Sequence, residues 1–327
     1  MIRKLQKKET VLTVVILLLI LLLTMFLSLF LGSVFISPTD LWQSNILWQI
    51  RLPRVILAAF IGLLLSISGV ILQGVLRNPL ADPYILGISA GAGVGAAVSI
   101  ALGAQFVVFG MSSVPASAFI FSLISVFVVY KLSQVAGKAS PETLILAGVA
   151  LSSFCAALLS LLIIVSGNLQ TIYFWLLGSL AAANWGNVLT VIPYAVVGVA
   201  AAYFFSKELN ALLLGEEMAM TLGVNVEYVK LLLIVFASLM TAAAVSVSGL
   251  IGFVGLIIPH WIRLLIGPNH RLLIPVSALS GMILMVAADA LARTIMAPIE
   301  IPIGVIMALV GAPFFLYLLR RRRVEGK

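Results

Sequence analysis

The sequence predicts an all-α polytopic membrane protein, with about ten transmembrane helices in two inverted five-helix halves and both termini in the cytoplasm. Three observations lead to this prediction: an apolar composition, a series of span-length apolar segments, and the distribution of basic residues. Of 327 residues, 63% are hydrophobic and only 9% are charged, whereas about a quarter are charged in soluble proteins. The mean hydropathy of +1.24 indicates that lipid solvates most of the surface.

Glycine, proline and charged residues divide the chain into ten apolar segments. A membrane-spanning helix needs roughly 20 apolar residues, and the segments are close to that length. The first of them, 11–31, is longer than the apolar part of a typical signal peptide and no A-x-A site follows it, so we expect an uncleaved first span. The predicted spans are 11–31, 54–76, 84–103, 110–130, 142–165, 187–206, 229–249, 252–267, 272–295 and 303–319.

The basic residues predict the orientation of these spans. With the N-terminus in the cytoplasm, the C-terminus and the links 77–83, 131–141, 207–228 and 268–271 also fall on the cytoplasmic side. Sixteen of the nineteen Lys and Arg residues then lie there, as the positive-inside rule requires. We therefore expect a multi-pass membrane protein with this orientation. The net charge of +8 reflects these flanks, which contact lipid headgroups, and does not indicate nucleic acid as a partner.

Three arginines, Arg51, Arg54 and Arg293, fall on the opposite, extracytoplasmic side. Asp289 precedes Arg293 by four residues near the outer end of the ninth span, and this spacing lets the two side chains pair. An ionisable residue within a span is a functional candidate by default. One charge of each sign, however, favours a structural ion pair.

The chain also contains an internal repeat. Ser68-Gly69 followed by Pro79 is matched, 180 positions later, by Ser248-Gly249 followed by Pro259. The pattern S-A-x-x-G occurs at 89–93 and again at 277–281. Five spans in each half would give the halves opposite orientations, as in transporters built from inverted repeats. We predict one transmembrane domain over 1–327, with halves at about 1–186 and 187–327.

Small residues mark a helix-packing face in the third span. Gly87, Gly91 and Gly95 recur every four residues, so another helix can approach that face closely. The same stretch reads G-x-G-x-x-A from Gly91, but it follows no predicted strand and lies in apolar helix. A dinucleotide site is therefore not expected there.

Several kinds of catalytic and cofactor motif do not occur in the sequence. Without a G-x-x-x-x-G-K-[ST] motif, this chain is not expected to bind ATP, and any ATP-derived energy would come from another subunit. No nucleophile elbow or zinc signature occurs either. With a single cysteine, Cys155, and two histidines, His260 and His270, neither a disulfide nor a metal site is expected. These absences give no indication of an enzyme or of a cofactor bound by this chain.

The longest cytoplasmic link, 207–228, lies between the halves and contains the segment G-E-E-M-A-M-T-L-G. Gly215 can begin a short helix, Glu216 and Glu217 suit its positive N-terminal end, and Gly223 can end it. The helix would expose three apolar side chains to a partner: Met218, Met220 and Leu222. From the residues alone, a surface helix without a partner is an equal alternative.

Taken in order, the motifs of this chain resemble those of permease subunits of FecCD-type ABC importers, which carry iron–siderophores, vitamin B12 and haem. The resemblance extends from Arg51 to Leu319. It is carried by R-L-P-R (51–54), S-G-x-x-x-Q (68–73), R-N-P-L-A-D-P (77–83), I-L-G-I-S-A-G-A (85–92), G-E-E-x-A-x-x-L-G (215–223), G-F-V-G-L-I-I-P-H-x-x-R (252–263), H-R (270–271), A-D-x-x-A-R (288–293) and E-I-P-I-G (300–304).

This resemblance implies a pore of two permease subunits, identical or paralogous, with ten helices each. Two cytoplasmic ATPases, which bind ATP and Mg²⁺, and an extracytoplasmic substrate-binding protein would complete the importer. The G-E-E-x-A-x-x-L-G segment is implied to be the coupling helix that enters the ATPase, through Gly215, Glu216, Glu217, Met218, Ala219, Leu222 and Gly223. The arginines at 51, 54 and 293 are implied to bind one acidic residue on each lobe of the binding protein.

The third and fifth spans, Gly87–Gly103 and Glu142–Val165, are implied to flank the pore. Their small and hydroxyl side chains would suit a bulky chelate: Ser89, Ser99, Ser152 and Ser153. Ferric siderophores are the expected substrates, with vitamin B12 and haem as alternatives. An ion-coupled secondary transporter is a competing class, but it would need carboxylates near the bilayer midplane, where this sequence has almost none. A membrane-embedded enzyme fits less well, because no His, Asp or Cys residues cluster.

Overall fold

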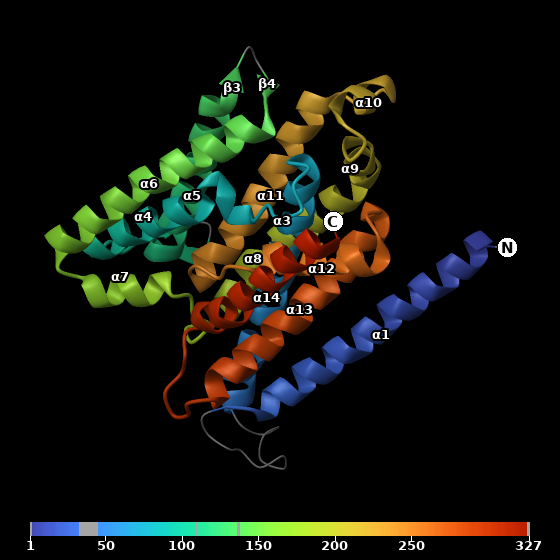
Figure 1. The fold of residues 1–327 in the computed structure, drawn as a ribbon. Coiled ribbons are helices and arrows are strands. Elements are labelled where there is room, and N and C mark those ends of the chain that lie inside the picture. Colours follow the sequence, from blue (N-terminus) through green and yellow to red (C-terminus); the bar gives the residue numbers. More distant parts are fainter. Residues whose placement is uncertain (1, 33–44, 109, 136–137, 326–327) are drawn as a thin grey trace.

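The structure is a computed structural model that describes residues 2–32, 45–108, 110–135 and 138–325. These residues form a helical bundle with two short antiparallel hairpins (Figure 1). In chain order the elements are α1 (Ile2–Phe30), η1 (Leu47–Arg51), α3 (Leu52–Val75), η2 (Pro83–Leu86), α4 (Ile88–Ala101), β1 (Val107–Val108), β2 (Met111–Ser112), α5 (Ser113–Ser133), β3 (Gln134–Val135), β4 (Lys138–Ala139), α6 (Pro141–Ser166), α7 (Leu169–Leu176), α8 (Trp185–Phe204), α9 (Ser206–Leu212), α10 (Glu216–Thr221), α11 (Val226–Ser248), α12 (Val254–Ile266), α13 (His270–Thr294) and α14 (Ile303–Glu325).

Each predicted span overlaps an apolar helix of the described chain. Seven of these helices are long and apolar enough to cross a membrane, with bounds Val11–Phe30, Leu47–Val75, Ser113–Ser133, Pro141–Ser166, Trp185–Phe204, Val226–Ser248 and His270–Thr294. The chain is thus a multi-pass helical membrane protein. The number of crossings and the side on which the termini lie remain predictions.

Three of the predicted spans are shorter than expected: Ile88–Ala101, Val254–Ile266 and Ile303–Leu316. At 1.5 Å per residue, the 13 residues of α12 extend only about 20 Å, against a hydrocarbon core of roughly 30 Å. Local backbone geometry explains two of these differences. The left-handed conformation of Gly87 (φ 76°) begins α4 late, and Phe253 (φ 70°) does the same for α12.

The irregular segments before α4 and α12 pack against each other. The Tyr84 hydroxyl accepts a hydrogen bond from the Ile251 N–H and donates one to the Ile251 carbonyl, both at 2.9 Å. Non-helical backbone is tolerated at membrane depth only where protein groups satisfy it or a cavity exposes it. This reciprocal pair therefore stabilises both helix starts.

Helix α3 is the centre of the bundle. In its most apolar stretch of 18 residues, 83% of the residues are buried, whereas 11% are buried in the corresponding stretches of α1 and α6. Helix α3 contacts α8, α11, α12 and α13. Two glycine pairs allow the closest approaches. A Cβ at Gly62 would collide with the Gly281 carbonyl of α13, and one at Gly69 would collide with the Gly255 carbonyl of α12.

Two ends of the bundle differ in character (Figure 1). Helices α9 and α10 and the β3–β4 hairpin project at one end, which corresponds to the links predicted to be cytoplasmic. The C-terminal end of α1 and the connection from α13 to α14 lie at the other. The sequence did not predict α7, α9 or the hairpins, because they are short elements. Helices α7 and α9 and the β3–β4 hairpin lie in links, and the β1–β2 hairpin overlaps the start of the predicted span 110–130.

The repeated motifs do not occupy equivalent places in the structure. Ser68-Gly69 lies in the interior of α3, whereas Ser248-Gly249 ends α11. The second match pairs α4, the third predicted span, with α13, the ninth, although two five-span halves would pair the third with the eighth. The short matches therefore do not support the repeat, and the division at 186–187 stays a prediction.

Candidate functional site

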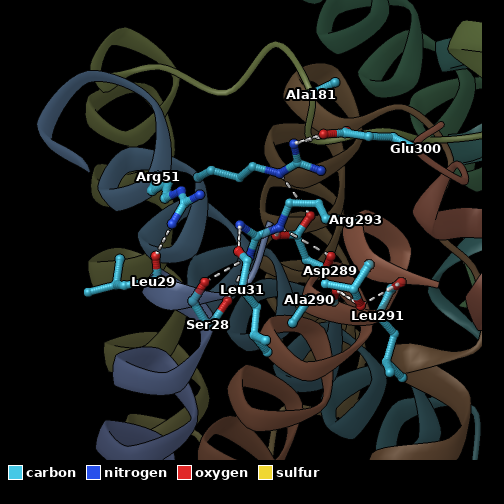
Figure 2. A network of polar contacts seen from close by, with 12 residues as sticks. Ser28, Leu29, Leu31, Arg51, Ala181, Asp289, Ala290, Leu291, Arg293 and Glu300 are labelled. Atoms are coloured by element: carbon cyan, nitrogen blue, oxygen red, sulfur yellow. Dashed lines mark hydrogen bonds and ion pairs between the residues drawn. The ribbon is translucent and has the colours of Figure 1, made fainter. Parts of the chain in front are cut away.

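The three arginines predicted to be extracytoplasmic lie at the end of the bundle where α1, α3 and α13 meet. Figure 2 shows Arg51 and Arg293 beside the C-terminal end of α1. Arg51 ends η1, and Arg54 lies in the first turn of α3, after Pro53 has fixed the helix start. Arg293 lies in the last turn of α13. They are only 5%, 6% and 3% exposed, respectively. All three side chains are therefore directed into the protein.

Arg54 is held between two carboxylates. Its Nε donates to Asp289 Oδ1 at 3.0 Å, and its Nη1 donates to both oxygens of Glu300 at 3.0 Å. Asp289 is fully buried, whereas the Glu300 side chain is 33% exposed. Glu300 is thus the carboxylate of this pair that solvent can reach.

Arg293 and Arg51 bind the C-terminal end of α1. Arg293 Nη1 donates to the Leu31 carbonyl at 3.0 Å and Nη2 donates to the Ser28 hydroxyl at 2.7 Å. Arg51 Nη1 donates to the Leu29 carbonyl at 2.8 Å. The last carbonyls of a helix lack intrahelical donors and carry its negative dipole end. The two guanidinium groups satisfy that end and fix α1 against α3 and α13.

The predicted pairing of Asp289 with Arg293 is confirmed, with Oδ2 3.1 Å from Nε. The contacts from Arg54 to Asp289 and Glu300, and those from Arg293 to Ser28, were not predicted. The presence of three arginines and two carboxylates at one predicted side of the membrane was the signal that could have indicated them. Docking of a binding protein on the arginines stays a prediction, and the structure adds that they are already paired internally.

At the opposite end, α10 takes the form expected from its sequence. Gly215, with φ 108°, precedes the helix, and the chain leaves it through Gly223 (φ 83°). Ala219 is buried against the protein, which fixes the outward face of the helix. That face exposes Met218 by 53%, Met220 by 52% and Leu222 by 61%, while Glu217 is also exposed. The predicted short helix with three exposed apolar side chains is confirmed.

Ion pairs attach α10 to the bundle. Glu216 lies 3.3 Å from the buried Lys230 ammonium and 3.8 Å from Arg77. Lys230 also pairs with Glu227 at 2.9 Å and donates to the Ala139 carbonyl of β4 at 3.0 Å. From the sequence, Lys230 is only one of the sixteen basic residues on the predicted cytoplasmic side. Its burial shows that it joins α10, α11 and the β3–β4 hairpin.

A groove of about 780 Å³ runs between α10 and the start of α6. Its lining combines charged and apolar side chains: Arg77, Ser140, Pro141, Glu142, Leu214, Gly215, Glu216, Glu217, Met218, Met220 and Thr221. Exposed apolar side chains that gather beside a groove mark an interaction surface. This end of the molecule therefore offers a protein partner both an apolar protrusion and a concave surface.

The small residues of α4 pack as predicted at two of three positions. A Cβ at Gly91 would collide with Ser125 of α5, and one at Gly95 would collide with the Ser117 carbonyl. The expectation for Gly87 was wrong, because this residue precedes α4 in a left-handed conformation and its neighbours lie at ordinary contact distances. Ser89 is half-buried.

Histidine and carboxylate side chains do not gather into a metal site in the part of the chain that the structure describes. His270 is buried, and its Nδ1 lies 2.8 Å from Asn210 Oδ1. This contact fixes the start of α13 against α9.

The bundle of span-length helices, with an interaction surface at one end, defines a multi-pass membrane subunit that works with partners. The sequence profile of the FecCD transport family matches residues 19–321, and the chain belongs to this family. It is 48% identical over 282 residues to the cobalamin import system permease protein BtuC of Halobacterium salinarum, covering 86% of this chain and 75% of that protein. It is 40% identical to the hemin transport system permease protein HmuU of Yersinia pestis, covering 90% and 91%.

A solved structure gives the same assignment. The chain matches, with a TM-score of 0.86 and 35% identity, an inward-facing conformation of a transporter assigned to the metal-chelate type of ABC transporters. The match covers 94% of this chain and 98% of that one. The protein is therefore an ABC importer permease of the FecCD type.

Proposed function

We propose that this chain forms, with a second permease subunit, the pore of an importer for metal chelates in a bacterial cell membrane. An extracytoplasmic binding protein delivers the substrate, and a separate ATPase dimer drives alternating access. The second subunit is a copy of this chain or a paralogue. ATP and Mg²⁺ bind to the ATPase and not to this chain.

The observation that carries this proposal is the exposed apolar surface of α10. Met218, Met220 and Leu222 lie outside the predicted spans, where lipid cannot cover them, and each is more than half exposed. Their burial in a partner would be favourable at about 25 cal/mol per Å² of apolar surface. Ion pairs of Glu216 with Lys230 and Arg77 hold the helix on the permease, so a movement of the partner would act on the bundle.

At the other end, we propose that the binding protein docks through acidic side chains near Arg51, Arg54 and Arg293. The motif positions of these arginines support the proposal, and so does the planar guanidinium group, which suits bidentate binding of a carboxylate. The internal pairing of Arg54 implies that a docking carboxylate must compete with Glu300, the accessible partner.

For the substrate, we propose a ferric siderophore, with cobalamin as a second candidate. The 48% identity to a cobalamin permease is the observation that favours this second candidate. Relatives named as cobalamin and hemin permeases are 48% and 40% identical to this chain, so overall similarity does not decide among bulky chelates.

Reconstitution tests this function directly. The chain, co-expressed with its ATPase, would be placed in vesicles together with its binding protein, and uptake of radiolabelled ferrichrome, cyanocobalamin and haem would be compared. We expect uptake of one of them to require ATP hydrolysis and to persist when ion gradients are dissipated. Uptake that follows a proton or sodium gradient without ATP would assign the chain to the secondary transporters.

A further inference from the structure

The C-terminal end of α3 carries a left-handed residue that is not glycine. The Asn78 N–H donates to the Gln73 carbonyl at 3.2 Å, and the Arg77 N–H donates to the Gly74 carbonyl at 3.3 Å. These two hydrogen bonds form the Schellman arrangement, in which the residue after the C-cap adopts a left-handed conformation and is usually glycine. Here that residue is Arg77, with φ 48°.

A left-handed arginine is unfavourable by roughly 1–2 kcal/mol relative to an ordinary conformation. Such conformations persist mainly at functional positions. The Arg77 side chain extends to Glu216 of α10, with 3.8 Å between Nη2 and Oε1, and it lines the groove beside that helix. An exposed ion pair adds little stability. The stability gained from this ion pair therefore does not account for the left-handed conformation of Arg77. We relate that conformation to the place of Arg77 beside α10.

One helical turn earlier in α3, Gln73 makes a buried polar contact with α12. The residue is 1% exposed. Its Nε2 lies 3.3 Å from the Gly255 carbonyl, 3.1 Å from the Leu256 carbonyl and 3.3 Å from the Ala81 carbonyl. Arg263 Nη1 donates to Gln73 Oε1 at 2.8 Å. A guanidinium only donates, so this contact fixes the orientation of the amide and directs its two N–H groups at the carbonyls.

Pro259 explains why a donor is needed at this place. It lies inside α12 and has no backbone N–H, so the carbonyl four residues earlier loses its helical hydrogen bond. That carbonyl belongs to Gly255. An unpaired buried carbonyl is unfavourable, and Gln73 supplies the missing donor from a different helix.

We propose that Gln73 and Arg77 are positioning residues that connect the coupling helix α10 to α12 through the end of α3. Gln73 replaces the backbone donor that Pro259 lacks, and Arg77 holds Glu216. Gln73 lies in the last turn of α3 and Arg77 directly follows its C-cap, so a displacement of α10 acts on the same helix end that fixes α12. The coupling part of this inference rests on the proposed function.

The donor replacement is tested in the full-length chain in nanodiscs by thermal unfolding. Gln73→Met keeps the side-chain volume and removes the amide. We expect it to lower Tm by several degrees. Combined with Pro259→Ala, which restores a backbone N–H to α12, the same change should lower Tm by less than half as much.

Pro275, which lies inside α13, provides the matched control. In the Pro275→Ala background, the full loss from Gln73→Met should remain. An equal loss in all three backgrounds would overturn the donor replacement. If Gln73→Met alone does not accumulate in membranes, Pro259→Ala should restore accumulation and Pro275→Ala should not.

The link to α10 is tested in the reconstituted importer by uptake per ATP hydrolysed, with the substrate identified by the uptake comparison proposed above. Arg77→Gly suits the left-handed backbone and should leave Tm equal or higher. It should nevertheless lower uptake per ATP several-fold, and Arg77→Lys should retain most of it.

A Leu222→Asp variant, which places a charge on the exposed apolar surface of α10, distinguishes failure of this inference from failure of the proposed function. If Leu222→Asp abolishes uptake while Arg77→Gly leaves uptake per ATP unchanged, the link is wrong and the coupling function stands. Wild-type uptake by Leu222→Asp would overturn the coupling function and, with it, the coupling part of this inference.

Discussion

Arg54 Nε lies 3.0 Å from Asp289 Oδ1, although the two residues are 235 positions apart in the chain. This buried pair joins α3 to α13. Because Asp289 also pairs with Arg293, one carboxylate serves two guanidinium groups. The cluster is therefore sensitive to the loss of that carboxylate.

Asp289→Asn should strongly destabilise the chain. It would leave Arg54 and Arg293 buried without their shared counter-charge, and removing one partner of a buried pair costs about 3–5 kcal/mol. Glu300→Gln is the matched control, because its carboxylate is partly exposed and should contribute no more than about 1 kcal/mol. Equilibrium unfolding of the full chain in detergent would measure both. If both variants lose equally little unfolding free energy, the ion pairs of Asp289 do not stabilise the fold.

Arg54→Lys should weaken docking of the binding protein while the chain still folds. Lysine keeps the positive charge but cannot bind a carboxylate in a bidentate manner. Arg54→Glu is less informative, because it would place a third carboxylate beside Asp289 and Glu300. Binding affinity measured at low and high salt is the readout, with Arg271→Lys at the opposite end as the control. Unchanged affinity at both salt concentrations would contradict docking at Arg54.

Leu222→Asp should abolish uptake without lowering Tm. The side chain is 61% exposed, so the folded permease tolerates a charge there, whereas an apolar partner surface would bury that charge without a counter-ion. Leu132→Asp, at the end of α5 and 69% exposed, is the control and should retain uptake. Normal transport by the Leu222 variant would show that α10 is only a connector.

Gly91→Ala should destabilise the chain by about 1–3 kcal/mol, because a Cβ there meets Ser125 and the backbone carbonyl of Phe121, and overpacking of a rigid site is unfavourable by that amount. Gly93→Ala is the matched control on the same helix. Its nearest neighbour is the mobile end of Leu176 at 3.1 Å. Unfolding of the two variants should differ clearly, and similar stability would contradict close packing of α4 on α5.

Asp82 should make stability depend on pH. Burial raises the pKa of its carboxyl from 3.8 to about 6, although the hydrogen bond accepted from the Tyr84 N–H opposes the shift. The folded chain then binds the proton more tightly than the unfolded chain, so stability should fall as pH rises from about 4 to about 6.

Asp82→Asn keeps an acceptor for Tyr84 and removes this titration. Relative to the wild type, the variant should gain stability on going from pH 4.5 to pH 7.5, by no more than about 3 kcal/mol at 1.36 kcal/mol per pKa unit. If the difference in unfolding free energy between the wild type and the variant does not change with pH, the pKa of Asp82 is not raised.

The sequence determined the properties that depend on local composition. Apolar runs of span length fixed the helical class, because a backbone in lipid must satisfy its own hydrogen bonds. The order of the polar motifs indicated the family. The α10 helix was also predictable, since Gly215 and Gly223 mark the two ends of a short segment and the glutamates after Gly215 suit a helix N-terminus.

Only the tertiary structure decided which distant groups meet. The sequence placed Arg51, Arg54 and Arg293 on one side of the membrane, but their burial depends on carbonyls of α1 and on Asp289 and Glu300, which no local pattern specifies. The sequence also did not show that α4 and α12 are short. The left-handed residues Gly87 and Phe253 delay the two helix starts, and the hydrogen bonds between Tyr84 and Ile251 stabilise the irregular segments there. Gln73 reads as an isolated polar residue in a span, and only the fold brings it to the carbonyl that Pro259 leaves without a donor.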